Sequence, residues 1–195
     1  MLVATMTVLL VVNKNAKGGK DMRRKNGFTL IELLIVVAII GILAALLIPN
    51  AMTALQKAKV RGTQKDLGTI ATSVLDYITD KGTPFVNNGD ISSTMKSALS
   101  PMYIKVLPLK DQWGGNFKVF TGTNVSGNWG IVNAVADDFL VTSYGRSSVI
   151  ESWTYDPANP NAGLYTISAS SDFDKDLINY NGSFIRGPRA GVSGT

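Results

Sequence analysis

Apolar side chains occupy almost every position from residue 28 to residue 48, and Pro49 ends this run. As an α-helix, these 21 residues would rise about 30 Å, which is the thickness of the hydrocarbon core of a bilayer. Glu32 is the only ionisable residue between Phe28 and Leu55. Because an isolated charge at that depth is costly, the pattern predicts a membrane-spanning helix whose carboxylate needs a partner.

A second helical pattern follows the apolar run. Apolar residues recur at the spacing of one helix face, with polar and charged residues between them. The predicted stripe consists of Leu67, Ile70, Ala71, Val74, Leu75 and Ile78. Gly82 and Pro84 then end the pattern, so we expect one helix over residues 28–81. Pro49 lies inside this helix and predicts a kink or a locally melted stretch between Gly41 and Pro49.

The remainder of the chain is rich in glycine, asparagine and serine and contains short β-prone runs. The expected strands cover residues 117–121, 129–135, 139–143, 163–169 and 178–185, after a short helix within 91–99. The residues expected to cover the helix stripe are Phe117, Val119, Ile131, Leu140, Val141, Tyr165 and Ile167. The economical arrangement is an α+β fold. In it, a long N-terminal α-helix, with a membrane half and an amphipathic half, packs on a small antiparallel β-sheet.

Composition excludes several classes of function. The net charge of +5 arises before residue 28, because six of the 19 Lys and Arg residues but only one of the 14 Asp and Glu residues precede it. The remaining 13 charges of each sign cancel, so no polybasic surface for nucleic acid is predicted. The chain has no Cys and no His, which excludes disulfides, zinc sites built on those residues and a histidine base.

Catalytic chemistry would have to rest on the remaining polar residues. The serines have no histidine to activate them, and the pair Asp137 and Asp138 fits a turn between strands better than a catalytic site. We therefore predict no enzymatic activity. The alternative, a membrane-anchored periplasmic enzyme or ligand-binding module, lacks a residue constellation that would support it.

A short basic segment, residues 22–27, precedes the apolar run and ends in Gly27. Together with Glu32, this junction resembles the type IV prepilin signal, which marks type IV pilins and the pseudopilins of type II secretion. The resemblance implies that the prepilin peptidase cleaves between Gly27 and Phe28 and that Phe28 is N-methylated. It also implies that Glu32 meets the N-terminal amine of Phe28 in a neighbouring subunit, and that the helix near Pro49 can unwind on assembly.

A secretory signal peptide is the alternative interpretation, with small residues at Ala44 and Ala45 beyond its apolar region. It fits less well, because Glu32 interrupts the apolar stretch and the stretch is too long. Codons for residues 17–19 can form a ribosome-binding sequence, which favours translation from Met22 and a six-residue leader. The predicted division is a cleaved leader at 1–27, a long helix at 28–81 with the transmembrane and filament core at 28–48, and a periplasmic β-rich domain at 82–195.

A basic cluster follows the apolar run. It consists of Lys57, Lys59, Arg61 and Lys65, with Asp66 the only acidic neighbour. Three interpretations remain open: a solvated helix face, contacts to lipid head groups, or contacts to acidic residues of a neighbouring subunit. Because both flanks of the apolar run are basic, the expected orientation, with the leader in the cytoplasm, rests on the cleavage motif.

Two further segments narrow the resemblance. Residues 107–117 resemble the Leu-Pro-x-Asp-Pro-Trp-Gly stretch of major pseudopilins, with Gln112 in place of the usual proline. Trp113 is expected to anchor the core there. Residues 139–145 resemble the strand that leads into the family's calcium loop, but Arg146 stands where the family has an aspartate. A cation does not belong in a calcium shell.

Three alternating carboxylates further along the chain predict a calcium site instead. Hard cations prefer several oxygen ligands, which such spacing can supply around one loop. The ligands would be Asp172, Asp174 and Asp176. A solvated acidic turn is the alternative. Calcium is the only cofactor that the sequence brings into question.

The resemblance implies a structural subunit, most like the major, G-type pseudopilin. It would polymerise through its N-terminal helix into a type II secretion pseudopilus that drives protein export. The expected partners are further copies of itself, minor pseudopilins, the prepilin peptidase and the inner-membrane secretion platform. The expected location is the bacterial inner membrane, spanned once, with the C-terminal domain in the periplasm. The alternative is a type IV pilin subunit of an extracellular fibre for adhesion or motility.

Overall fold

The computed structural model describes residues 27–189, and the predictions for the leader before Gly27, including the start at Met22, lie outside them. Its first element is α1 (Leu30–Lys81), a helix of 52 residues, which confirms the predicted long N-terminal helix. The chain divides into two compact units, Met1–Leu43 and Ala44–Thr195, and each is described by itself.

The helix continues through Pro49 without a break. The predicted locally melted stretch is therefore wrong for the single chain, although the proline removes one backbone donor. Side chains supply hydrogen bonds around the same turn: the amide of Asn50 donates to the carbonyl of Leu46 at 3.5 Å, and the hydroxyl of Thr53 donates to the carbonyl of Pro49 at 3.1 Å. Unwinding in a filament stays a prediction.

A six-stranded sheet follows, with the strand order β1-β2-β3-β5-β6-β4. All neighbouring strands are antiparallel except β4 and β6, so the sheet is antiparallel in its main part, as predicted, and mixed at one edge. The strands are β1 (Asn88–Asp90), β2 (Lys118–Thr121), β3 (Phe139–Ser143), β4 (Leu164–Tyr165), β5 (Leu177–Tyr180) and β6 (Ser183–Pro188). The remaining elements are α2 (Ser93–Leu99), η1 (Gly122–Val125), η2 (Asn128–Gly130) and η3 (Ser170–Asp174).

The strand predictions succeed where the residues alternate and fail where the backbone turns. Strands β2 and β3 confirm two of the predicted strands, whereas the strand predicted at 163–169 is reduced to β4. The strand predicted at 178–185 is a hairpin of β5 and β6. Its turn consists of Asn181 at φ 48° and Gly182 at φ 85°, the left-handed pair that a two-residue hairpin turn requires.

The strand predicted at residues 129–135 is wrong. Trp129 lies within η2 at φ 45°, and the glycines on either side of this turn, Gly127 and Gly130, also have positive φ. Three left-handed residues close together cannot form an extended strand. The β-prone side chains of this segment therefore fold over the sheet instead of extending it.

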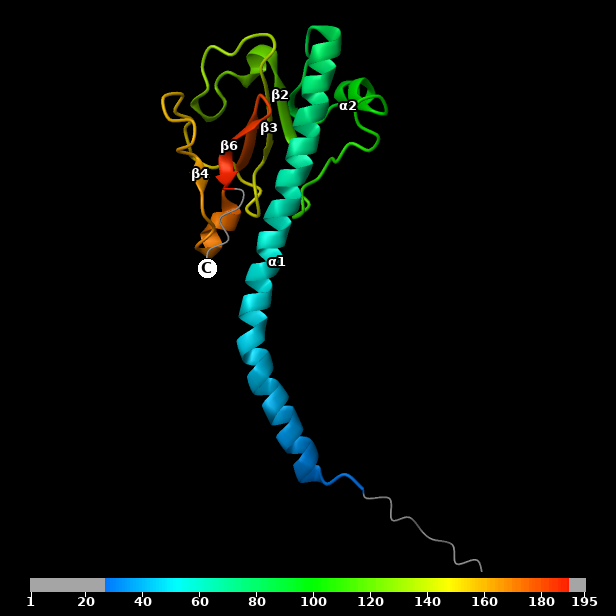
Figure 1. Ribbon diagram of the computed structural model, residues 1–195, viewed down its shortest axis with the longest axis vertical. Helices are drawn as coiled ribbons and strands as arrows, with labels where there is room; N and C mark the ends of the chain where they lie inside the picture. Colours follow the sequence, from blue (N-terminus) through cyan, green and yellow to red (C-terminus); the bar gives the residue numbers. More distant parts are fainter. Residues whose placement is uncertain (1–26, 190–195) are drawn as a thin grey trace, which may run out of the picture. The chain divides into compact units, whose positions relative to one another are not determined.

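The helix stripe packs on one face of the sheet (Figure 1). Leu67, Ile70, Ala71 and Val74 are buried and Ile78 is partly buried, which confirms most of the predicted stripe. Leu75 is 46% exposed, so its assignment to the stripe is wrong. The sheet and its flanking segments contribute Met95, Leu99, Phe117, Val119, Phe139, Val141, Phe173 and Leu177 to this core.

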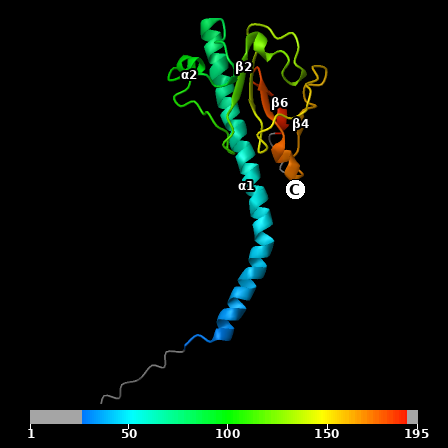
Figure 2. The same cartoon turned by 180° about the vertical axis from the view of Figure 1, so that it is seen from behind.

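A second apolar core lies on the opposite face of the sheet. Adjacent strand residues point to opposite faces, so Val119 and Val141 face α1, whereas Phe120 and Leu140 face away from it. Leu140 and Ile131 were predicted to cover the helix stripe, and that assignment is wrong. The second core comprises Phe120, Val125, Trp129, Ile131, Leu140, Ile178 and Ile185. Long connections cover it on the side away from α1 (Figure 2).

Candidate functional site

The start of α1 carries the predicted processing and assembly residues. Phe28 is 81% exposed and precedes Thr29, which stands directly before the helix. Glu32 Oε2 accepts hydrogen bonds from the backbone N–H and the hydroxyl of Thr29, both at 2.8 Å, and Thr29 Oγ1 accepts from the N–H of Glu32 at 3.3 Å. This reciprocal arrangement is a capping box. Its sequence signal, Thr-x-x-Glu, is readable from the chain, but the sequence analysis assigned Glu32 to assembly alone.

Glu32 has no ion-pair partner within residues 27–189. Its carboxylate lies in the first turn of α1, where the N-terminal end of the helix favours negative charge. One carboxylate can therefore fix the start of its own helix in the single chain and remain available to a cation from another chain.

The first half of α1 exposes its apolar side chains. Almost all the large apolar residues from Phe28 to Leu55 are exposed. Across the part of the chain that the structure describes, α1 is the one helix with the length and apolar composition to span a bilayer, and the mean hydropathy of its apolar 18-residue window is 3.1. One face of its second half, by contrast, is buried from Val60 to Val74.

The segment before β2 is organised by Asp111. Asp111 Oδ1 accepts hydrogen bonds from the N–H groups of Trp113 at 3.0 Å and Gly115 at 2.8 Å, and Oδ2 accepts from the hydroxyl of Ser143 at 2.7 Å. A Cβ atom at Gly115 would lie 2.9 Å from Asp111 Oδ2, so the turn requires glycine there. The aspartate thus ties the turn to the end of β3.

The same segment is attached to α1. Trp113 is partly buried against the helix-side core, as expected of an anchor, and its Nε1 donates to Gln56 Oε1 at 2.8 Å. The amide of Gln112 donates to Asp66 Oδ2 at 3.0 Å, and its side chain lies over Gly62, where a Cβ would be 3.0 Å from it. The departure from proline at position 112 therefore supplies a hydrogen bond to the helix.

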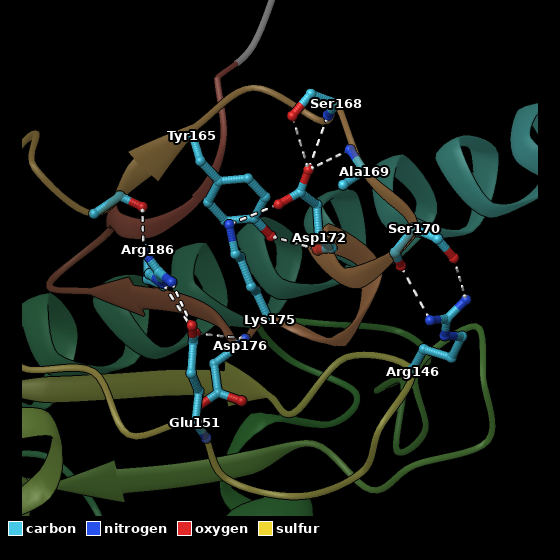
Figure 3. A network of polar contacts seen from close by, with 11 residues as sticks. Arg146, Glu151, Tyr165, Ser168, Ala169, Ser170, Asp172, Lys175, Asp176 and Arg186 are labelled. Carbon is cyan, nitrogen blue, oxygen red and sulfur yellow. Dashed lines mark hydrogen bonds and ion pairs between the residues drawn. The ribbon is translucent and has the colours of Figure 1, made fainter.

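The three predicted calcium ligands are directed at different partners, and Figure 3 shows two of them, Asp172 and Asp176. Asp172 accepts from Lys175 Nζ at 2.6 Å and from the N–H groups of Ser168 and Ala169, each at 2.8 Å. Burial alone would raise the pKa of Asp172, but these donors outweigh it and hold the pKa well below its ordinary value. This carboxylate is ionised and its charge is balanced within the chain.

Asp174 is paired with Arg146, the residue that departs from the calcium-loop pattern. Arg146 Nε and Nη2 donate to the two carboxylate oxygens of Asp174, each at 2.8 Å, and Nη2 also donates to the carbonyl of Ser170 at 3.0 Å. The hydrogen bonds from the guanidinium lower the pKa of Asp174. The end of β3 and η3 are therefore joined by a cation that belongs to the chain itself.

Asp176 is fully buried in a different environment. Asp176 Oδ2 accepts from Trp129 Nε1 at 2.8 Å and from the N–H of Glu151 at 2.9 Å, while Oδ1 has no hydrogen-bond partner within residues 27–189. Burial raises its pKa to about 6, since desolvation outweighs the two donated hydrogen bonds. No group of three or more acidic residues suited to a metal ion occurs in the described range 27–189. Calcium binding at these aspartates stays a prediction, and each carboxylate has a partner of its own.

Arg186 is a buried cation that the sequence analysis missed. It pairs with Glu151 and donates to the carbonyl of Gly163 at 3.3 Å. Its guanidinium carbon lies 5.1 Å from the centre of the Trp153 ring and 5.3 Å from that of Tyr165. The arrangement fixes the long connection between β3 and β4 against β6. The contacts join residues far apart in the chain, so no local pattern indicates them.

The pKa of Asp176 leads to a testable pH dependence. A carboxyl group whose pKa is raised on folding stabilises the folded state below its unfolded pKa, and this contribution is lost as the pH rises through about 6. The wild-type chain should therefore be more stable at pH 5 than at pH 7.5 by about 1–2 kcal/mol. Asp172 and Asp174 titrate below this window. Denaturation of the full chain in detergent, followed by tryptophan fluorescence, measures the difference.

Asp176→Asn is the matched variant for this measurement. An amide keeps an acceptor for Trp129 Nε1 and the N–H of Glu151 but has no charge to desolvate. Its stability should change little between pH 5 and pH 7.5. An unchanged pH slope in this variant would assign the dependence to another group.

Comparisons with known proteins agree with these observations. Residues 22–48 match the prokaryotic N-terminal methylation motif. The type II secretion system core protein G of Pseudomonas aeruginosa is 35% identical over 105 residues, which cover 49% of this chain and 73% of that protein. Core protein G of Escherichia coli is 30% identical over 138 residues, or 64% and 94% of the two chains. Fimbrial protein EcpB of Eikenella corrodens is 42% identical over 66 residues, or 34% and 42%. No solved structure matches the chain significantly.

A methylation motif at the start of a long apolar helix, followed by a β-sheet on which the second half of that helix packs, defines the class of pilin-like proteins. The chain belongs to the family of the type II secretion system core protein G, the G-type pseudopilins.

Proposed function

We propose that this chain is a structural subunit, cleaved between Gly27 and Phe28, that polymerises through α1 into a type II secretion pseudopilus. The observation that carries the proposal is the coincidence of the methylation motif, residues 22–48, with the exposed apolar start of α1. Before assembly, this segment would span the inner membrane once, and the domain that follows residue 81 would lie in the periplasm. The proposed role is structural and involves no reaction catalysed by the chain.

Glu32 would set the register of assembly. Cleavage gives Phe28 a free amine, and Glu32 has no cationic partner within residues 27–189. Among packed apolar helices neither charge is stable alone, so the carboxylate of one subunit would pair with the amine of the next. The unbroken helix at Pro49 would then be the membrane form, with unwinding confined to the filament.

The proposed partners follow from this cycle. The prepilin peptidase would process the chain and methylate Phe28. An inner-membrane platform would add subunits to the filament, and minor pseudopilins would join it. These assignments rest on the methylation motif and on the kinship to core protein G, whose name refers to the secretion system.

The intact mass of the mature chain tests the processing step. Co-expression with an active prepilin peptidase should yield a chain that begins at Phe28 and is heavier by one methyl group. An inactive peptidase should leave Gly27 and the residues before it in place. A mature chain that begins near Ala45 would instead identify a secretory signal peptide and overturn the proposal.

A type IV pilin of an extracellular fibre is the second candidate. The similarity to fimbrial protein EcpB favours it, although that match covers 34% of this chain. The matches to core protein G extend further, to 64% of the chain for the Escherichia coli protein. Genes for a secretion ATPase and secretin beside the coding sequence would support the pseudopilus, and a retraction ATPase would support the fibre.

A further inference from the structure

One edge of the globular domain contacts α1 shortly after the apolar run. The segment before β2 reaches the helix through Trp113 and Gln56, and η3 approaches it beside Thr53 and Lys57. Figure 1 and Figure 2 both place η3, drawn in orange, at the end of the domain where α1 leaves the sheet. We call this the basal edge, and it comprises Lys57, Lys59, Arg61, Lys65, residues 109–113, residues 146–150 and η3.

Cations without acidic partners gather at the basal edge. They are Lys57, Lys59, Arg61, Lys65 and Lys110, and none forms an ion pair within residues 27–189. The acidic residue closest to them along α1 is Asp66, which accepts a hydrogen bond from Gln112. Further acids on α1, Asp76 and Asp80, lie at least two turns beyond Asp66. Within the basal edge, Asp172 and Asp174 are paired with Lys175 and Arg146, and Asp111 accepts hydrogen bonds from uncharged groups. Asp66 and Asp111 together do not balance the five unpaired cations, so the basal edge keeps an excess of positive charge.

Exposed apolar side chains lie along the same edge. Val149 is 66% exposed and Ile150 is 53% exposed, in a loop held to η3 by the bond from Ser147 Oγ to the carbonyl of Asp174. Leu109 is also exposed, beside Lys110. Apolar and basic side chains together are typical of surfaces that rest on a membrane interface.

Distance along the helix relates these groups to the membrane. Thr53 lies about 8 Å and Lys57 about 14 Å beyond Ile48, at the rise of an α-helix. A head-group layer is about 5–8 Å thick, and the Debye length is about 8–10 Å at physiological salt. Lys57 therefore lies within one Debye length of the head groups, and its long side chain can reach toward them.

A recess lies at this position. A pocket of about 150 Å³ is lined by Thr53 and Lys57 of α1 and by Ile167, Ser168, Ala169, Ser170 and Phe173. It places Lys57 beside a partly polar hollow. The unpaired cations, the exposed apolar side chains and the position of Lys57 along α1 thus all favour contact between the basal edge and lipid head groups.

From these observations we infer that the basal edge rests on the phospholipid surface and prefers anionic head groups while the subunit is anchored in the membrane. The inference rests on the proposed membrane anchoring by residues 28–48. It answers the open question about the basic cluster in favour of lipid. It also gives the membrane-bound subunit a defined contact with the lipid surface, and the subunit would break this contact when it enters a filament.

Quenching by labelled lipids tests the inference in the full chain. Because the sequence contains no cysteine, Val149→Cys provides a single site for a bimane fluorophore at the basal edge. Met102→Cys provides the control: Met102 is 85% exposed, and the adjacent Tyr103 packs on Tyr77, about 36 Å along α1 from Thr53. Both chains are placed in nanodiscs, with or without phosphatidylglycerol, that contain a lipid with a nitroxide on its head group.

The bimane at position 149 should be quenched at least about twofold more than at position 102, with a further increase when phosphatidylglycerol is present. High salt should abolish the increase. The triple variant Lys57→Gln, Lys59→Gln, Lys110→Gln should remove it as well. Its matched control, Lys81→Gln, Lys96→Gln, Lys105→Gln, removes the same charge from exposed sites elsewhere and should retain it.

Equal quenching at positions 149 and 102 in chains that co-elute with nanodiscs would overturn the inference while leaving the anchoring intact. Failure to co-elute would count against the anchoring and the inference together. If the basal variant retains its lipid response but assembles poorly, the cations serve an interface between subunits and the lipid assignment is wrong.

Discussion

Replacing Glu32 by Gln should abolish filament formation while the chain still enters the membrane. Gln retains the capping box with Thr29, because an amide oxygen can accept the same hydrogen bonds. It removes only the charge that would neutralise the amine of the neighbouring Phe28. An unpaired buried charge costs about 3–5 kcal/mol, which would weaken each subunit addition by a factor of about 150 to 5,000. Sedimentation and electron microscopy of assembled material measure the loss.

Glu32→Ala is the companion variant, since it removes both the charge and the cap. Its loss of assembly should be as complete as that of Glu32→Gln. Fractionation should find both variants in the membrane. Normal filaments from Glu32→Gln, together with failure of Glu32→Ala, would show that the carboxylate serves only to start α1. The two functions of the residue can therefore be separated within one position.

Glu151→Ala should destabilise the globular domain by about 3 kcal/mol, since it leaves Arg186 buried without its carboxylate. Arg186 retains the carbonyl of Gly163 and the rings of Trp153 and Tyr165, but none of these carries a compensating charge. Chemical denaturation of the full chain in detergent, followed by circular dichroism, provides the free energy of unfolding.

Two controls define the origin of this loss. The double variant Glu151→Leu with Arg186→Met removes both charges and should recover at least half of it, because apolar replacements often equal a buried pair. Asp90→Ala breaks the ion pair with Lys118, in which Asp90 is 57% exposed, and should cost at most about 1 kcal/mol. If the double variant were as unstable as Glu151→Ala, the loss of stability would be due to packing and not to the unpaired charge of Arg186.

The helix and the helix-side core could be predicted from sequence because their signals are local. Leu67, Ile70 and Val74 recur at helical spacing, and burial follows from that period. Leu75 misled the prediction because it stands at the margin of the stripe, where the sheet does not reach it.

The second core could not be predicted in the same way. Trp129, Val125 and Ile131 come from turns without periodicity, and left-handed backbone at Trp129 redirects the segment over the sheet. Phe120 and Leu140 alternate correctly with their neighbours, but alternation does not state which face is covered.

The acidic segment illustrates a different limit. The spacing of Asp172, Asp174 and Asp176 identified a cluster of charge but not the partners of its members. Lys175 lies within the same stretch, whereas Arg146 approaches Asp174 from 28 residues away. A list of carboxylates cannot show which cations the fold brings to them. The capping box at Thr29, by contrast, was local and could have been recognised.

The two-sided sheet has a mechanical consequence. If the proposed pseudopilus pushes cargo, the load on each subunit would pass through α1 and enter the domain by shear between the helix and the side chains of the first core. Strand β3 contributes Phe139 and Val141 to that core and Leu140 to the other, so it is the shared wall between them. The connections that cover the far face lie outside the load path. In that case they could vary in length without altering how force passes from one subunit to the next.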